Sequence, residues 1–166
     1  MLLGLAMGMV ACATGTSAGG AGASTTFVLV RHAEKGTDDA RDPSLSEAGR
    51  ARAARLAQLL ADSPLSAAYA TDYRRTRQTA QPAADGHGIV VTTYDAQVAA
   101  AEFAARLRAS HAAGTVLVVG HSNTIPQLAA ALSGTAAVEM RDDEFDRLYR
   151  IKVGADGRAV LSQDSY

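Results

Sequence analysis

Two histidines each follow a run of apolar residues that favour β-strands. Residues 27–30 lead directly into Arg31 and His32, and residues 116–120 lead into His121. If both runs are buried parallel strands, both imidazoles lie at the same carboxyl edge of one sheet, where open α/β folds bind their ligands. Two imidazoles and a guanidinium at one edge suit an anion, so the sequence predicts a phosphate-binding site there.

Two further arginines lie at the N-terminus of a predicted helix, where the helix dipole disfavours positive charge. Arg74 and Arg75 occupy the first turn of a predicted helix over residues 74–84, which Thr71 or Asp72 is expected to cap. Cations at a helix N-terminus oppose the macrodipole, at a cost of a few tenths of a kcal/mol each. Free helix amides with an arginine also suit an anion, and the alternative is a solvated basic face.

If the bound anion is a phosphate ester that this site cleaves, a poor leaving group would need a general acid. Asp95 directly follows the predicted strand 89–94 at the same edge of the sheet, so it is the first candidate. Glu102, inside the next predicted helix, is the second. Asp95 could instead cap that helix.

The elements that would position these residues alternate between strands and helices. Strands are predicted at residues 27–31, 67–70, 89–94 and 116–120, and helices at residues 46–61, 74–84, 97–111 and 125–132, with Ser46 capping the first helix. This order implies right-handed crossovers and a three-layer α/β fold, with helices on both faces of a mainly parallel sheet. Residues 147–153 and 158–161 predict a C-terminal antiparallel edge hairpin.

Length and composition indicate one ordinary domain. The chain has 166 residues, of which 48% are hydrophobic and 20% charged, and its formal net charge is −1. Such a balance gives no reason to expect binding to nucleic acid or to an anionic membrane surface. The sequence makes no prediction of oligomeric state.

The first 26 residues are expected to lie outside the folded domain, which would then span residues 27–166. An apolar stretch over residues 1–10 is followed by Cys12 and by a polar, glycine-rich spacer. Residues 9–12 resemble a bacterial lipoprotein processing site, which predicts export with lipidation of Cys12 and a membrane tether. An ordinary cleaved signal or a wrongly assigned start codon are the alternatives. Cys12 is the only cysteine, so no internal disulfide is possible.

The motifs resemble those of the histidine phosphatase superfamily, which has the phosphoglycerate mutase-like fold. The family places Arg-His-Gly after its first strand, Leu-Thr/Ser-x-x-Gly at the start of its first long helix, a Ser-x-x-x-Arg-Ala-x-Gln-Thr-Ala motif later, and Gly-His after a buried strand. The matching segments are residues 31–33 (RHA), 45–49 (LSEAG), 71–80 (TDYRRTRQTA) and 120–123 (GHSN). The resemblance spans residues 27–132, and its departures, Ala33, Thr71 and Thr76, remove no charged group. In size and openness the chain resembles the small, single-domain phosphohistidine phosphatases of the superfamily.

By this resemblance, His32 is the nucleophile that accepts the phosphoryl group. Arg31, Arg75 and His121 would hold its oxygens as two guanidiniums and an imidazolium, without a metal ion or another cofactor. Arg75 is preferred to Arg74 because the essential arginine of the family precedes the position held here by Thr76. His32 must be neutral, so its other ring nitrogen is expected to donate to a backbone carbonyl.

Other function classes fit the sequence less well. A serine hydrolase would need Gly-x-Ser-x-Gly around Ser122, but Thr124 occupies the last position. A zinc enzyme would need clustered ligands, and the histidines lack paired spacing. A phosphoglycerate mutase-type transferase normally carries longer insertions over its site. A phosphate-binding or interaction lipoprotein without turnover is the strongest rival to a phosphatase. The expected substrates are phosphorylated small molecules or surface glycans.

Overall fold

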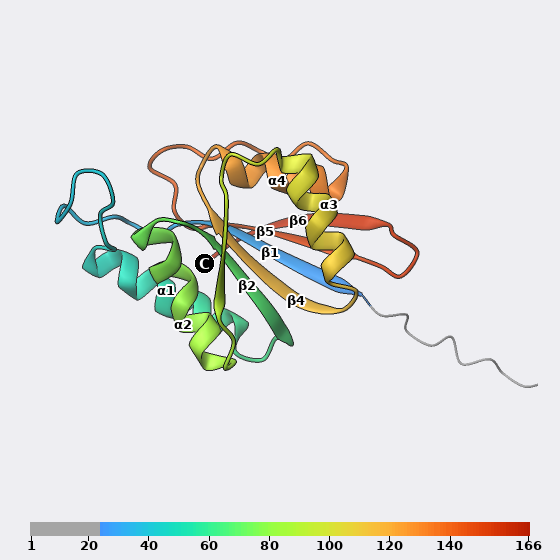
Figure 1. The fold of residues 1–166 in the computed structure, drawn as a ribbon, viewed down its shortest axis with the longest axis horizontal. Helices are drawn as coiled ribbons and strands as arrows, with labels where there is room; N and C mark the ends of the chain where they lie inside the picture. Colours follow the sequence, from blue (N-terminus) through green and yellow to red (C-terminus); the bar gives the residue numbers. More distant parts are fainter. Residues whose placement is uncertain (1–23) are drawn as a thin grey trace, which may run out of the picture.

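The computed structural model describes residues 24–166 and shows an α/β fold with one six-stranded sheet (Figure 1). The predicted export signal and Cys12 lie outside the described residues. Strands and helices alternate through the first eight elements, and two strands end the chain. The strands are β1 (Thr25–Arg31), β2 (Leu65–Thr71), β3 (Val91–Tyr94), β4 (Gly114–Gly120), β5 (Arg147–Val153) and β6 (Ala159–Ser165). The helices are α1 (Glu47–Leu60), α2 (Arg74–Gly86), α3 (Ala100–Ser110) and α4 (Thr124–Ser133).

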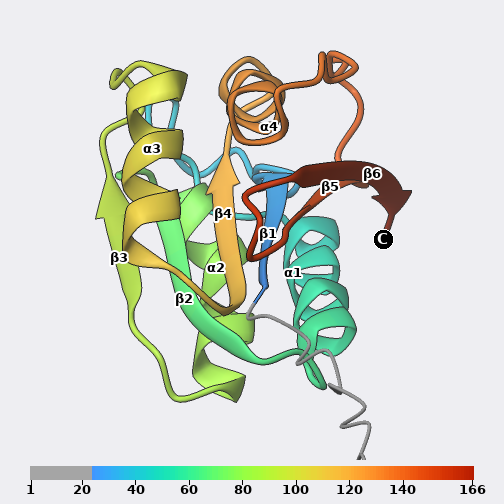
Figure 2. The same ribbon diagram turned by 90° about the vertical axis from the view of Figure 1, so that its right-hand side faces the viewer.

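The sheet has the strand order β3-β2-β4-β1-β5-β6. The pairs among β1, β2, β3 and β4 are parallel, whereas β5 is antiparallel to both β1 and β6. Figure 2 shows β3 at one edge and the β5-β6 hairpin at the other. The predicted three-layer, mainly parallel α/β fold with a C-terminal antiparallel hairpin is confirmed.

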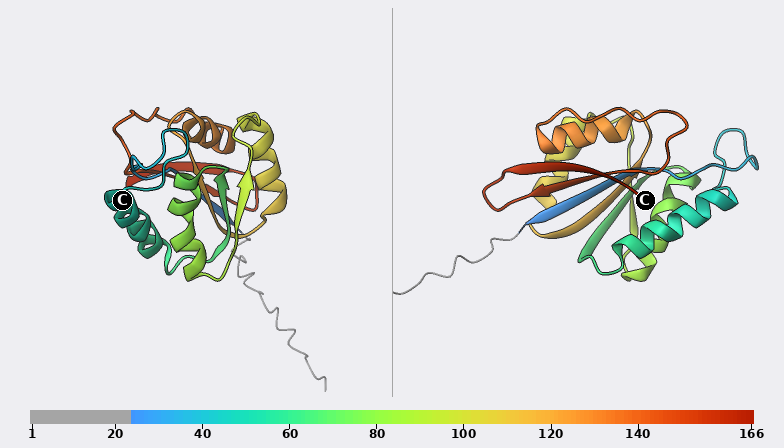
Figure 3. Two further views of the ribbon diagram at one scale, coloured as in Figure 1. Left: turned by 60° about the vertical axis from the view of Figure 1, so that its left-hand side comes forward. Right: turned by 180° about the vertical axis from the view of Figure 1, so that it is seen from behind.

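Both faces of the sheet are covered because the middle of the central strands β1 and β4 is apolar on both faces. Along β1, Phe27 and Leu29 face α3 and α4, while Val28 and Val30 face α1 and α2. All four side chains are fully buried. The two helical layers on opposite faces are visible in Figure 3. The parallel central strands end together, so the residues after β1 and β4 meet at one edge.

The start of α1 packs against the segment that follows His32. The hydroxyl of Ser46 accepts a hydrogen bond from the amide of Gly49, which confirms Ser46 as the N-cap. Gly49 packs directly on the backbone of Glu34, because a Cβ at residue 49 would lie 2.2 Å from the Glu34 carbonyl oxygen. The chain after His32 is thereby held against α1.

The predicted boundaries of α3 and β6 differ from the observed ones. Helix α3 begins at Ala100, three residues later than predicted, because residues 95–98 form a turn in which Asp95 accepts a hydrogen bond from the amide of Gln97. Strand β6 runs on to Ser165, since β5 offers it a partner along its whole length. Within residues 24–166, we find no helix with the length and apolar character needed to cross a bilayer.

Candidate active site

His32 lies directly after β1 and is held by the backbone on two sides. Its amide donates to the carbonyl of Gly120 over 2.9 Å, and its ring Nδ1 lies 2.7 Å from the carbonyl of Ala33. A carbonyl only accepts, so Nδ1 carries the proton and Nε2 keeps its lone pair. Burial, with the nearby charges of Arg75 and Arg31, lowers the pKa of His32 to about 4. A neutral imidazole with a free Nε2 is a nucleophile at neutral pH.

His121 follows β4 and faces His32 edge to face, with 5.5 Å between ring centroids. Its Nε2 lies 2.9 Å from the hydroxyl of Thr71 at the end of β2. That hydroxyl donates to Thr76, whose own proton goes to backbone carbonyls, so it must accept from Nε2–H of His121. Burial, followed by the charges of Arg75 and Arg31, lowers the pKa of His121 to about 4. This lowered pKa favours the neutral ring in the free protein, whereas the imidazolium expected from the resemblance concerns the site with a bound phosphoryl group.

Arg31 is 8% exposed and is fixed by the segment that precedes β5. Its Nη1 lies within hydrogen-bond distance of three carbonyls, those of Arg141 (3.1 Å), Asp142 (2.9 Å) and Glu144 (3.1 Å). The guanidinium also lies 4.3 Å from the centre of the Phe145 ring. Its buried Nε has no hydrogen-bond partner among the described residues. Such an orphaned donor on a buried cation calls for an anion.

Arg75, in the first turn of α2, is held between a ring and a carboxylate. Its guanidinium lies 4.2 Å from the centre of the Tyr73 ring, and Nη1 is 3.8 Å from Asp42. Its Nε is also buried without a partner among residues 24–166. Tyr73 contacts both Arg75 and His121, and His121 faces His32, so the three groups lie in one site.

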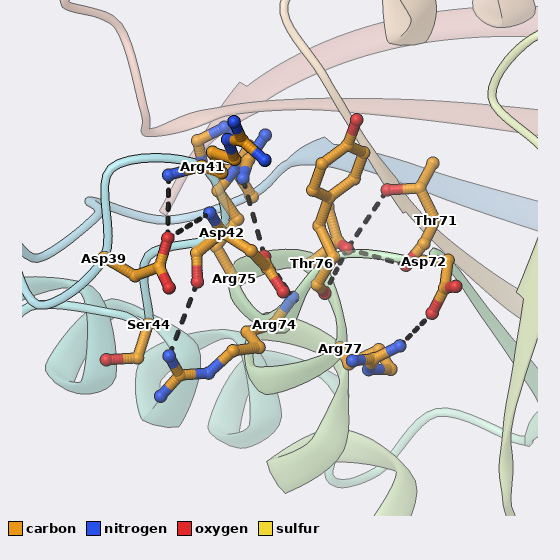
Figure 4. Close-up of polar contacts among 12 residues, drawn as sticks. Asp39, Arg41, Asp42, Ser44, Thr71, Asp72, Arg74, Arg75, Thr76 and Arg77 are labelled. Atoms are coloured by element: carbon orange, nitrogen blue, oxygen red, sulfur yellow. Dashed lines mark hydrogen bonds and ion pairs between the residues drawn. The ribbon is translucent and has the colours of Figure 1, made fainter.

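The N-terminus of α2 is capped from a distant segment. The prediction that Thr71 or Asp72 caps this helix is wrong. The N-cap is Tyr73, and the carboxylate of Asp42 accepts a hydrogen bond from the amide of Arg74 over 2.8 Å. Figure 4 shows Asp42 beside Arg74 and Arg75. Thr71 is instead engaged with His121 and Thr76. The basic first turn is thus tolerated because a carboxylate lies beside it.

The two candidate general acids lie in different surroundings. Asp95 is exposed after β3 and lines a cavity together with Thr71 and Tyr73, whereas α3 has Ala99 as its N-cap. The helix-cap interpretation of Asp95 is therefore wrong. The side chain of Glu102 is 66% exposed on α3 and lies 3.9 Å from Arg106. Of the two, only Asp95 shares a cavity with residues that contact the histidines.

Three contacts of the site were not expected from the sequence. Tyr73 lies edge to face with His121, with 5.3 Å between centroids, and also contacts Arg75. Phe145 contacts Arg31 and lies 6.2 Å from the His32 ring. Asp42 joins the loop before α1 to the start of α2. Tyr73 lies inside the second motif and could have been singled out there, whereas Asp42 and Phe145 lie in irregular segments without a pattern.

The comparisons with known proteins agree with this geometry. Residues 27–97 match the family model of the histidine phosphatase superfamily (branch 1). A search of curated proteins finds no match. Among solved structures, the protein histidine phosphatase SixA in complex with tungstate is similar at a TM-score of 0.66 and 17% identity, over 84% of this chain and 96% of that chain.

Two further solved structures share the same fold. A mycobacterial glucosyl-3-phosphoglycerate phosphatase is similar at a TM-score of 0.60 and 18% identity, over 86% of this chain and 98% of that one. A phosphoglycerate mutase from Bacillus anthracis is similar at a TM-score of 0.65 and 15% identity, over 87% and 94% of the two chains. The resemblance of this chain to the histidine phosphatase superfamily, with its phosphoglycerate mutase-like fold, is thereby confirmed.

Proposed function

We propose that the chain is a histidine phosphatase that hydrolyses phosphomonoesters or phosphohistidine through a covalent phosphohistidine on His32. The observation that carries this proposal is the neutral imidazole of His32, with Nε2 free, in one site with the buried Arg31 and the half-buried Arg75, whose Nε–H groups lack partners in the described structure. A nucleophile next to unsatisfied cationic donors is what phosphoryl transfer needs.

The reaction has two balanced steps. Nε2 of His32 attacks phosphorus, the N–P bond forms, and the bond from phosphorus to the leaving oxygen breaks with its electron pair on that oxygen. Water then attacks the phosphohistidine, the N–P bond breaks, and inorganic phosphate leaves. Arg31, Arg75 and His121 hold the phosphoryl oxygens in both steps. No metal ion takes part in this scheme.

Asp95 is the proposed general acid, in preference to Glu102. It would give its proton to the leaving oxygen and take one from the attacking water. Asp95 lines the same cavity as Thr71 and Tyr73, which both contact His121. Glu102 lies against Arg106 on the outer side of α3.

Hydrolysis is favoured over phosphoryl transfer between substrates because the site is open. Only five residues, 95–99, connect β3 to α3, so this connection provides no segment long enough to close over His32 and His121. Water then reaches the phosphohistidine. A mutase-type reaction would require its exclusion.

Removal of the nucleophile tests the proposal. We expect His32→Ala to lose phosphate release from p-nitrophenyl phosphate by at least about 10³-fold. His87→Ala is a matched control, since His87 contacts only the carbonyls of Ala83 and Ser63 through its ring nitrogens. Rapid acid-free quenching should trap labelled phosphate on His32 in the wild type. Equal turnover in His32→Ala and wild type would refute the proposal, and a chelator should leave the rate unchanged.

We also propose that the phosphatase domain, residues 27–166, is exported and tethered through Cys12. The basis is the segment 1–26 described from the sequence, which resembles a lipoprotein signal and spacer. Its substrates would then be phosphorylated small molecules or surface glycans outside the cytoplasm. Expression with labelled palmitate should mark the wild type and not Cys12→Ser; label in both would contradict the tether.

A further inference from the structure

A cavity of about 510 Å³ opens beside the phosphate cup, by which we mean Arg31, His32, Arg75 and His121. Two of its walls touch the cup directly. Thr71 accepts a hydrogen bond from His121, and Tyr73 lies against both His121 and the guanidinium of Arg75. A phosphoryl group held in the cup would therefore direct the rest of its substrate into this cavity.

The chemistry of the cavity differs sharply from that of the cup. Its lining residues are Thr71, Asp72, Tyr73, Thr93, Tyr94, Asp95, Ala96 and Gln97. They offer two aromatic rings, hydroxyls, an amide and two carboxylates, and none of them carries positive charge. Asp72 is ion-paired with Arg77 outside this lining, whereas Asp95 has no ion pair among the described residues. Hydroxyl groups of a ligand can donate to the carboxylates, and the C–H face of a sugar or polyol can pack on the rings.

The cavity on the other side of the cup has the same polarity. It has a volume of about 290 Å³ and lies next to His121, at Ser122 and Asn123. Glu139 and Asp142 line it, and again no cation is among its described lining residues. A second negative charge on the leaving group would be repelled by Asp95 in the first cavity and by Glu139 and Asp142 in the second, since none of these three carboxylates has an ion-pair partner among residues 24–166.

Resting on the proposed function, we propose that the preferred substrates are phosphomonoesters of neutral, hydroxylated leaving groups, such as sugars and polyols. The cup binds the phosphoryl dianion, and the cavity beside Tyr73 binds the hydroxyls. Leaving groups with a carboxylate or another phosphate are discriminated against by the unpaired carboxylate of Asp95.

A matched pair of substrates tests this inference. Sorbitol 6-phosphate and 6-phosphogluconate have the same six-carbon chain and differ only at the far end, a hydroxymethyl group against a carboxylate. We expect kcat/KM to be at least about tenfold higher for sorbitol 6-phosphate, since like charges in a cleft disfavour binding. Equal values, or a preference for 6-phosphogluconate, would overturn the inference.

A charge placed in the cavity should change this ratio. Thr93 is exposed on β3 and lines the cavity, whereas its neighbour Thr92 is exposed and does not. We expect Thr93→Arg to raise kcat/KM for 6-phosphogluconate about tenfold and Thr92→Arg to leave the ratio unchanged. Gln97→Lys, in the exposed turn of the same cavity, is a second variant if Thr93→Arg folds poorly. An unchanged ratio in both cavity variants would count against the inference.

Two readouts separate this inference from the proposed function. Inhibition by inorganic phosphate reports on the cup alone, so its constant should stay within about twofold in the cavity variants. Turnover of p-nitrophenyl phosphate reports on the chemistry. If the wild type turns over this ester without preferring sorbitol 6-phosphate, only the substrate class is wrong. If it turns over none of the three esters, the proposed function itself fails, and the substrate class falls with it.

Discussion

The hydroxyl of Thr71 lies 2.9 Å from Nε2 of His121, so the last residue of β2 holds the imidazole that follows β4. Thr71 is 1% exposed and is itself bonded to the fully buried Thr76. A buried chain of two hydroxyls therefore sets both the orientation and the tautomer of His121.

Thr71→Val keeps the side-chain shape and removes this anchor. The unsatisfied Nε2–H of His121 should lower the free energy of unfolding by about 1–2 kcal/mol and kcat/KM by about tenfold or more. Denaturant unfolding and steady-state kinetics measure the two effects. Thr71→Ser retains the hydroxyl and should stay close to wild type; a loss of activity as large as that of the valine variant would argue against an anchoring role.

Phosphate binding should take up a proton at His121. In the free protein Nε2–H is bonded to Thr71, so Nδ1 holds a lone pair and can donate only after the ring is protonated. A phosphate dianion in the cup favours the protonated ring and raises the pKa of His121 from about 4. Calorimetric titration of phosphate at pH 6.5 in buffers of different ionisation enthalpy gives the number of protons taken up. Zero uptake would mean that His121 binds phosphate as a neutral ring.

Stability should fall as the pH is lowered from about 6.5 to 4.5. His32 and His121 have folded-state pKa values of about 4, below their ordinary value of 6.5. The unfolded chain thus binds more protons in this window, and unfolding becomes easier as the pH falls. We expect the Tm to drop by roughly 5 °C or more between pH 6.5 and 4.5.

The carboxylates cannot cause this drop at its upper end. Ion pairs and hydrogen bonds lower the pKa of Glu34, Asp38 and Glu144, so these groups lose stabilisation only below their unfolded values of about 4 to 4.5. The variant His32→Asn with His121→Asn should show a flatter Tm profile above pH 4.5. A profile as steep as that of the wild type would assign the effect to other groups.

Gly120→Ala should displace His121. A Cβ at residue 120 would lie 2.6 Å from Oη of Tyr94 and 2.9 Å from Cδ1 of Ile125. Residue 120 is fixed on its other side, since its carbonyl accepts the amide of His32. We expect kcat/KM to fall by about 10²-fold, because about 1 Å of misplacement is costly in a catalytic site. Adding Tyr94→Phe removes the closest atom and should restore part of the rate; no recovery would locate the clash at Ile125.

Gly49→Ala should mainly destabilise the fold. The added Cβ would lie 2.2 Å from the carbonyl oxygen of Glu34, and backbone cannot move aside as a side chain can. We expect a loss of about 3 kcal/mol in the free energy of unfolding. Gly86→Ala is the matched control, since a Cβ at the end of α2 meets nothing within 4 Å. A small effect at residue 49 would show that α1 can shift away from Glu34.

The sequence predicted those parts of the site that follow from strand ends and from motif positions. Arg31, His32 and His121 come together because β1 and β4 are adjacent parallel strands, which their apolar composition indicates. Arg75 was predicted as a phosphate ligand from its place in the motif of residues 71–80 and from the unfavourable position of a cation in the first turn of a helix. The place of Glu102 inside helix α3 was predicted too, but not that its side chain lies exposed beside Arg106.

What sequence could not predict depends on contacts between distant irregular segments. Asp42 reaches α2 from the loop before α1, and Phe145 reaches Arg31 across more than one hundred residues. Neither contact produces a periodic pattern in the sequence, because each depends on the conformation of a loop. The lowered pKa of His121 in the free protein could not be predicted for a related reason, because burial is a property of the assembled sheet edge.

The three carbonyls around Nη1 of Arg31 have a consequence for how the bend at residues 141–144 can vary. This bend contacts the Arg31 guanidinium only through main-chain oxygens, while the side chains of Arg141 and Asp143 are 78% and 70% exposed. Exchanges of those side chains should be harmless, whereas inserting or deleting a single amino acid would pull the oxygens out of register with the cation. Chain length, more than residue identity, is therefore what natural variation in this bend has to preserve.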